Sequence, residues 1–115
     1  MRSAFATVLE PLARQRGVLG CLVAGEEDGI LVDAFVRDAV DGAALAALAA
    51  ALHRRARLAS GAAGLGGVSF VRLDADGGHL CVLGHNELVL AVFAQSGANV
   101  GVIRSTMLRS LEALA

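Results

Sequence analysis

Two histidines and one cysteine lie close together in the sequence, and these are residue types that bind zinc. His79, Cys81 and His85 fall within seven positions. In an alternating strand His79 and Cys81 would share one face, but His85 would lie in the following turn and a tetrahedral site would lack its fourth ligand. The segment that opens at Asp74 resembles a calcium loop, yet His85 stands where a bidentate glutamate is needed. We therefore expect no metal ion and no cofactor.

Other residue patterns that could carry chemistry are incomplete as well. Cys21 and Cys81 lie in apolar stretches without a CxxC pair, so we expect buried, reduced thiols. The glycine-rich segment 61–67 follows a predicted helix and precedes a predicted strand, the reverse of a nucleotide-binding loop, and it is interpreted as a linker. Three consecutive acidic residues at 26–28 fall in a turn, where we expect them to be solvated. Catalysis by a pair of carboxylates is therefore not supported. The sequence predicts a protein that is not an enzyme.

The composition indicates one domain that binds neither nucleic acid nor membranes. The chain has 115 residues, 56% of them hydrophobic, so we expect residues 1–115 to form a single domain around one core. The net charge is −1 with scattered charges, and only four aromatic residues are present, all Phe. The sequence therefore offers little of the basic face and the stacking residues that nucleic-acid-binding proteins use. No apolar run approaches about 18 residues and the N-terminus lacks a secretory pattern, so a cytoplasmic location is expected.

Hydrophobic periodicity places three helices along the chain. In the first, Pro11 interrupts an amphipathic stripe, so either the helix bends there or it begins at Thr7 with Glu10 closing a capping box. The second, from the N-cap candidate Asp41, is rich in Ala, Leu and Arg and is the longest. The predicted helices are residues 4–16, 41–60 and 99–114.

Short runs of apolar and β-branched residues predict five strands, at 18–24, 30–36, 68–74, 79–83 and 87–94. Turns are expected at 28–29, 76–78 and 84–86. These turns are too short for parallel crossovers, so the sequence predicts an α/β (α+β) fold, α-β-β-α-β-β-β-α, whose sheet is mainly antiparallel with helices on both faces. The strands 18–24 and 87–94 are apolar on both faces and should be central, whereas 68–74 carries charges and should be peripheral.

The long helix offers one face to the sheet and others to solvent. The stripe expected on the sheet consists of Leu45, Leu48, Ala49, Leu52, Ala56 and Ala59. The outer face is expected to carry small alanines, including Ala46 and Ala50, beside His53, Arg54 and Arg57. These last three residues are either a patch for an acidic partner or the solvated end of a helix, whose dipole favours positive charge there.

A flanking seam on the same helix has near-heptad spacing and small side chains, which would let two copies of the helix approach closely. The strand from Val68 would lie at the sheet edge, where only Arg72 and Asp74 protect unpaired backbone groups, and pairing with a second copy would satisfy that edge. The predicted homodimer interface therefore comprises Ala44, Ala47, Leu48, Ala51, Arg55, Leu58, Val68, Phe70 and Arg72.

These landmarks, taken in order, resemble the roadblock/dynein light chain domain. They begin with a Gly-Val-x-Gly run inside residues 16–23 and an Asp-Gly turn at 28–29. The Ala-Leu helix from Asp41 and the edge strand from Val68 follow, and an Ala-Asn-x-Gly-x-x-Arg element at 98–104 opens the last helix. The resemblance covers almost the whole chain.

The resemblance implies a five-stranded antiparallel sheet and a homodimer joined through the long helix and an edge strand. Bacterial members of similar length include regulators of a gliding-motility GTPase and components of actinobacterial operons that encode a sensor kinase and a GTPase. The expected function is therefore a non-enzymatic dimeric regulator or scaffold of a small Ras-like GTPase, as an activator or as a signalling subunit. The alternatives are a small-ligand sensor with a pocket between sheet and helices, and an enzyme that uses Cys21 or Cys81.

Overall fold

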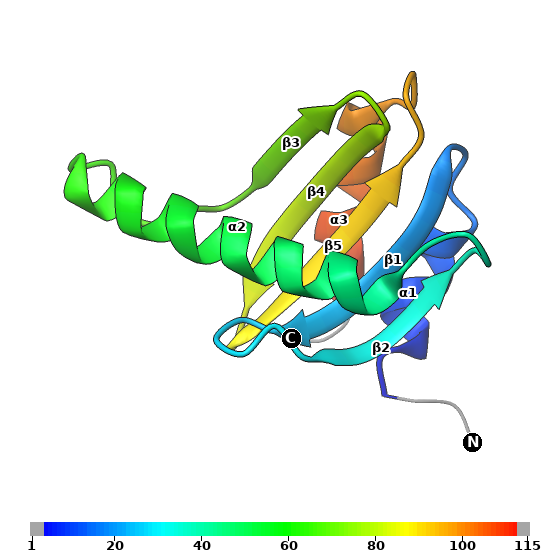
Figure 1. Ribbon diagram of the computed structural model, residues 1–115, viewed down its shortest axis with the longest axis horizontal. Coiled ribbons are helices and arrows are strands. Elements are labelled where there is room, and N and C mark those ends of the chain that lie inside the picture. Colours follow the sequence, from blue (N-terminus) through cyan, green and yellow to red (C-terminus); the bar gives the residue numbers. More distant parts are fainter. Residues whose placement is uncertain (1–3, 113–115) are drawn as a thin grey trace.

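The computed structural model describes residues 4–112 and contains the eight expected elements in the expected order. The helices are α1 (Ala6–Ala13), α2 (Gly42–Ala62) and α3 (Val100–Glu112). The strands are β1 (Val18–Gly25), β2 (Leu31–Val36), β3 (Val71–Ala75), β4 (Gly78–His85) and β5 (Leu88–Ala94). All four strand pairs are antiparallel and form one sheet in the order β2-β1-β5-β4-β3 (Figure 1).

The helices cover both faces of this sheet and create two separate hydrophobic clusters. On one face α1 and α3 lie side by side, and their apolar residues, among them Leu9, Leu12 and Ile103, pack on Cys21 and Val92 of the sheet. On the opposite face α2 lies alone and crosses the strands (Figure 1). The predicted fold class, with helices on both faces and one helix unaccompanied, is confirmed.

Strand burial explains the order of the sheet. β5 lies at the centre between β1 and β4, and most residues of these three strands are buried. Side chains that are apolar on both faces require cover on both sides, which only interior strands receive. β2 and β3 form the two edges and are half-buried or exposed. The predicted interior positions of the first and fifth strands and the peripheral position of the third are confirmed.

The first helix is shorter than predicted. It begins after Phe5, whose backbone carbonyl accepts from Val8 N and Leu9 N at 3.0 Å, and no side chain caps it, so the capping-box alternative is wrong. Pro11 lies within the helix with its ring exposed. The helix ends at Ala13 because the chain must reverse into β1 within a few residues. The residues predicted to extend α3 beyond Glu112 lie outside the described part of the chain.

The face of α2 that contacts the sheet differs from the predicted leucine stripe. The buried residues are Ala46, Ala49, Ala50 and His53, whereas Leu48 is 44% exposed. Of the predicted stripe, only Ala49 is fully buried, while leucines at 45 and 52 pack at the flanks. Ala46, Ala50 and His53 are predicted on the outer face of the helix but lie on its inner face, so that prediction is wrong.

Small side chains explain why α2 turns this alanine face, and not the leucine stripe, toward the sheet. The turn between β1 and β2 passes directly under the helix, and a Cβ added to Gly29 would lie 3.3 Å from the Ala47 Cα and 3.6 Å from the Ala50 Cβ. A larger residue on the inner face would push the helix away from this turn and open a void. Alanine permits the close approach, so the leucines are displaced to the sides.

The glycine-rich segment 61–67 begins as the last two residues of α2 and then forms the cap of that helix. α2 continues to Ala62, and Gly64 adopts a φ of +80°, where a residue without Cβ is favoured. Leu65 N donates to Ser60 O at 2.9 Å and Gly64 N donates to Gly61 O at 3.1 Å, the hydrogen-bond pattern of a Schellman cap. The predicted helix end at Ser60 is therefore two residues short.

The third strand begins at Val71, three residues later than predicted. Val71 pairs with Val82 in β4, and Val68 and Phe70 precede the strand. The chain leaves α2 on one face of the sheet and must reach its edge before it can pair. Two of the residues predicted to line the edge thus lie in the connection.

The turn between β4 and β5 also differs from the prediction of 84–86. Asn86 and Glu87 form it, with φ values of 47° and 67°, and β4 extends to His85. Both central residues in the left-handed region are typical of a type I′ hairpin turn, which matches the twist of the flanking strands. The predicted Asp-Gly turn after β1 is confirmed, with Ile30 N donating to Asp28 Oδ1 at 2.9 Å.

Candidate functional site

The seam predicted for self-association lies on the outward side of α2. Ala44, Ala47 and Arg55 are exposed, and Ala51 is half-buried. Leu48 and Leu58, two large apolar side chains of this seam, are 44% and 66% exposed. The inner face of α2 packs on the sheet through alanines, so within residues 4–112 these two leucines remain largely exposed. This seam is therefore an apolar stripe on an exposed helix.

The last turns of α2 extend beyond the edge of the sheet, past β3 (Figure 1). Leu58 belongs to the last two turns of α2, and Leu65, just after the glycine cap, is 80% exposed. Leu65 is not among the predicted site residues, because the segment 61–67 is interpreted from the sequence as a linker. A glycine followed by a leucine after an Ala-rich helix is typical of a helix cap with an apolar residue behind it. This pattern could have identified Leu65 from the sequence.

The exposed edge of the sheet next to this extension is β3. In the described part of the chain β3 pairs with β4 alone, which leaves its outer backbone groups without a strand partner. Arg72, one of the residues predicted for the dimer interface, is exposed on this strand. Val68 and Phe70 are half-buried, and the Phe70 ring lies 4.8 Å under the guanidinium of Arg104 in α3. Phe70 is thus engaged within its own chain.

Charges on the β3–β4 hairpin form a small network at this edge. Arg72 Nε donates to Asp74 Oδ1 at 2.8 Å, and His79 Nδ1 lies 2.6 Å from the same oxygen. The hydrogen bond from Arg72 and then that from His79 lower the pKa of the Asp74 carboxyl. The hydrogen bond to Asp74 likewise raises the pKa of Arg72. These paired charges protect an edge strand against unspecific pairing.

The three residues of the predicted basic patch contact the turn after β1. Arg54 Nη1 donates to the backbone carbonyls of Glu26 and Glu27, at 2.6 and 3.0 Å. Arg57 Nε lies 2.9 Å from Glu26 Oε1 as an ion pair. His53 is 5% exposed and lies on the inner face of α2. The arginines therefore tie the helix to the β1–β2 turn, and the histidine is not at the surface.

His53 is an unusual core residue because neither ring nitrogen has a hydrogen-bond partner among the described residues. Its Nδ1 lies 3.5 Å from Glu26 Oε1, within ion-pair distance if the ring is protonated. The ring packs closely against β4, where a Cβ on Gly84 would lie 2.6 Å from its Cε1 and Nε2 atoms. Gly84 therefore makes room for the imidazole.

Comparison with known proteins places this chain in a family. Residues 4–94 match the Roadblock/LC7 domain, which is more than half of the chain. The chain belongs to the Roadblock/LC7 family. Among relatives of this domain, the uncharacterized protein MJ0714 of Methanocaldococcus jannaschii is 30% identical over 105 residues, covering 91% of this chain and 88% of that protein. The predicted resemblance is confirmed.

Solved Roadblock/LC7 structures share the complete architecture. A Roadblock/LC7 domain from Streptomyces avermitilis superposes with a TM-score of 0.83 at 23% identity, over 93% of this chain and 91% of that one. MglB of Myxococcus xanthus gives a TM-score of 0.84 at 15% identity, over 97% and 92% of the two chains. The gliding protein MglB from Thermus thermophilus gives 0.81 at 18% identity, over 100% and 91%. These likenesses confirm the fold.

The Roadblock/LC7 chain carries its two cysteines as buried free thiols, as predicted. Burial raises the pKa of Cys21 to about 12 and that of Cys81 to about 11. A thiol that stays neutral is a poor nucleophile and a poor metal ligand. Within residues 4–112 no three His, Cys, Asp or Glu side chains gather as a metal site. In the same range no helix is long and apolar enough to cross a membrane.

A cavity between the sheet and the α1–α3 layer of this Roadblock/LC7 domain is very small. It measures about 10 Å³ and lies among Phe5, Val8, Leu90 and Leu111. Such a volume holds about one water molecule. This space is too small for a metabolite. Larger hollows, of about 370 and 570 Å³, lie where the end of α1 meets β1 and β2, and they are open at the surface.

Proposed function

We propose that this Roadblock/LC7 protein is a non-enzymatic homodimeric regulator of a small Ras-like GTPase. The observation that carries the proposal is an exposed apolar seam on α2 beside an open β3 edge. A helix face and a strand edge that lie next to each other can both be covered by one second copy of the chain. The dimer then presents a broad two-fold surface to a partner.

The geometry of the seam supports the homodimer. Its residues recur at spacings of four and three, which keeps them on one side of the helix. The exposed alanines at 44 and 47 allow a second α2 to approach closely, and Leu48 and Leu58 supply apolar surface. Burial of each leucine contributes about 1.5–3 kcal/mol relative to exposure. Pairing of two β3 edges would add backbone hydrogen bonds across the same two-fold axis.

The family supports a regulatory role toward a GTPase. The resemblance seen in the sequence implies regulators of a gliding-motility GTPase, and structures of the gliding protein MglB share this fold. A regulator of this kind binds the switch loops of its partner and shifts them toward the hydrolytic arrangement. It needs no nucleophile of its own, which agrees with the inert thiols of Cys21 and Cys81.

Binding to a candidate GTPase tests the proposed function. The purified protein should be titrated with a small Ras-like GTPase encoded beside its gene, loaded either with GDP or with a non-hydrolysable GTP analogue. We expect binding that differs between the two nucleotide states, because the switch loops differ between them. Absence of binding in both states would contradict a role as a GTPase regulator.

A further inference from the structure

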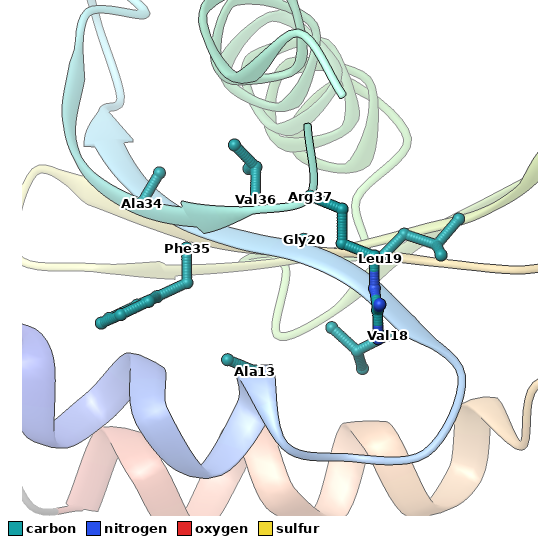
Figure 2. A pocket seen from close by; sticks show the side chains of 8 residues that line it. All are labelled: Ala13, Val18, Leu19, Gly20, Ala34, Phe35, Val36 and Arg37. Atoms are coloured by element: carbon teal, nitrogen blue, oxygen red, sulfur yellow. The ribbon is translucent and has the colours of Figure 1, made fainter. Parts of the chain in front are cut away.

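Three arginines from two separate segments surround one hollow at the end of the domain near β2. Arg14 and Arg16 lie in the connection between α1 and β1, and Arg37 follows β2. The hollow that they line has a volume of about 570 Å³. Figure 2 shows the Arg37 side chain running down past the start of β1 toward the loop that leads from α1. We call this feature the basic hollow.

The charge of the basic hollow is not balanced by the residues around it. All three arginines are exposed, and among the described residues none of them forms an ion pair. No acidic residue belongs to its lining. The whole chain has a net charge of −1, so the concentration of positive charge is local. Guanidinium groups bind carboxylates in a bidentate way, and their fixed charge persists at every physiological pH.

Neutral groups in the basic hollow can also donate hydrogen bonds to an anion. Gln15 and Gln95 both line it. Thr106 Oγ1 lies 2.9 Å from Gln15 Oε1 and 3.1 Å from Val102 O, and it shares its one proton between these two acceptors. This contact holds the Gln15 side chain at the hollow. The hollow therefore combines charged donors with an oriented neutral donor.

An apolar groove joins the basic hollow directly. It has a volume of about 370 Å³ and shares Ala13, Val18, Leu19 and Arg37 with the basic hollow. Phe35, which is 41% exposed, points toward α1 along this groove (Figure 2). A ligand that fits both parts must carry negative charge next to an apolar side chain.

The outer edge of β2 is partly closed to an added strand, which favours recognition through side chains. Arg37 N donates to Leu19 O at 3.1 Å, so by alternation the N–H of Ala34 faces the outer edge of β2. Asp33 Oδ1 accepts from that N–H at 2.9 Å. This carboxylate occupies an edge donor that an added strand would need.

We propose that the basic hollow and the adjoining groove bind an acidic segment of a partner protein, with carboxylates on the three arginines and an apolar side chain beside Phe35. The site lies at the β2 edge of the sheet, whereas the predicted dimer surface lies at the β3 edge and along α2 (Figure 1). It remains accessible in the proposed dimer and adds a second binding surface beyond the proposed function.

Fluorescence polarisation with a labelled peptide of four glutamates followed by two leucines tests this proposal. We expect binding that weakens as salt rises, because the guanidinium groups are exposed and screened. Arg16→Gln and Arg37→Gln should each weaken binding about tenfold, through the loss of one charge-assisted pair. Arg109→Gln removes one positive charge from α3, outside the basic hollow, and should leave binding unchanged.

Two further probes separate this site from less specific ones. A peptide with serines in place of the leucines should bind several-fold more weakly, and inorganic pyrophosphate should compete poorly. Equal loss of binding in Arg109→Gln, or displacement by pyrophosphate at concentrations equal to those of the peptide, would overturn the proposal. Thermal melts of the variants should match that of the wild type, since the substituted side chains are exposed.

Discussion

The side chains of Cys21 and Cys81 lie in the cluster between the sheet and the α1–α3 layer. Burial raises both thiol pKa values, to about 12 and about 11, so the folded protein holds both groups neutral at physiological pH. In the unfolded chain a thiol ionises near its ordinary pKa of 9.0. Ionisation therefore favours the unfolded state once the pH exceeds 9.

The thiols should be unreactive in the folded protein and should make its stability depend on alkaline pH. We expect no reaction with a disulfide reagent at pH 8 until denaturant is added. Because the folded pKa values are raised, the stability from neutral thiols is fully present below pH 9 and is lost as the pH rises toward 11 and 12. Urea titrations of wild type and Cys81→Ala measure this slope, which should be shallower in the variant. Rapid labelling of the folded protein would show that the thiols are not protected.

The contact between Gly84 and His53 gives a second test at residue scale. A Cβ at position 84 would lie 2.6 Å from two atoms of the buried ring, so Gly84→Ala should destabilise the protein by about 1–3 kcal/mol. Gly84→Ala should cost much less stability in a His53→Ala background, where the ring is absent. Urea denaturation of the wild type, the two single variants and the double variant measures this coupling.

A matched control for this pair is Gly77→Ala, because a Cβ on Gly77 meets no atom within 4 Å. Its effect should stay within about 0.5 kcal/mol. Additive effects of the substitutions at 84 and 53 would show that the glycine is not needed for the ring.

Among the elements, the β4–β5 hairpin is held by an unusual turn. Glu87 adopts a φ of 67°, and a side chain in the left-handed region costs about 1–2 kcal/mol. Glu87→Gly creates an Asn-Gly pair, the preferred sequence of a type I′ turn, and should stabilise the protein by about 1 kcal/mol. Thermal denaturation measures the change.

The control for the hairpin is Asp76→Gly in the β3–β4 turn, where the backbone φ of Asp76 is not positive. Glycine relieves no backbone strain at this position, and it raises the conformational entropy of the unfolded chain. The substitution should therefore lower the stability of the protein. A stabilisation at both positions, or at neither, would contradict the role assigned to the left-handed backbone at Glu87.

Element order and sheet layout could be predicted from the sequence because they depend on local patterns. Continuous apolar runs mark β1 and β5 as interior strands, and Asp41 marks the start of α2, where its carboxylate accepts from Ala44 N at 3.0 Å. The end of α2 could not be predicted in this way. Its cap depends on the left-handed backbone at Gly64, and every glycine of the segment 61–67 could adopt that conformation.

The rotation of α2 could not be predicted from hydrophobicity alone. A count of apolar side chains favours leucines for the inner face, whereas the close turn at Gly29 requires alanines there. The same limit applies to the basic patch, since only the fold shows that Arg54 and Arg57 reach the turn after β1. The arginines of the basic hollow come from two segments, the α1–β1 connection and the end of β2, and their proximity depends on how those segments meet.

At the scale of the whole molecule, the two edges of the sheet have different surroundings. The β3 edge adjoins the exposed seam of α2, and the β2 edge adjoins the basic hollow and its apolar groove. A homodimer joined at the first edge would leave two copies of the second edge open, related by a two-fold axis. Under the two proposals made above, such an assembly would bind a GTPase on one surface and acidic segments on others.

Sedimentation equilibrium decides whether the seam of α2 is a self-association surface. Leu48→Glu places a charge on the seam, and Leu108→Glu on α3 is a matched control because the two leucines are 44% and 45% exposed. We expect a mass twice the 11.7 kDa of one chain for wild type and Leu108→Glu, and a single-chain mass for Leu48→Glu. A wild-type protein that sediments as a single chain, or a Leu48→Glu variant that keeps the double mass, would contradict a dimer joined through α2.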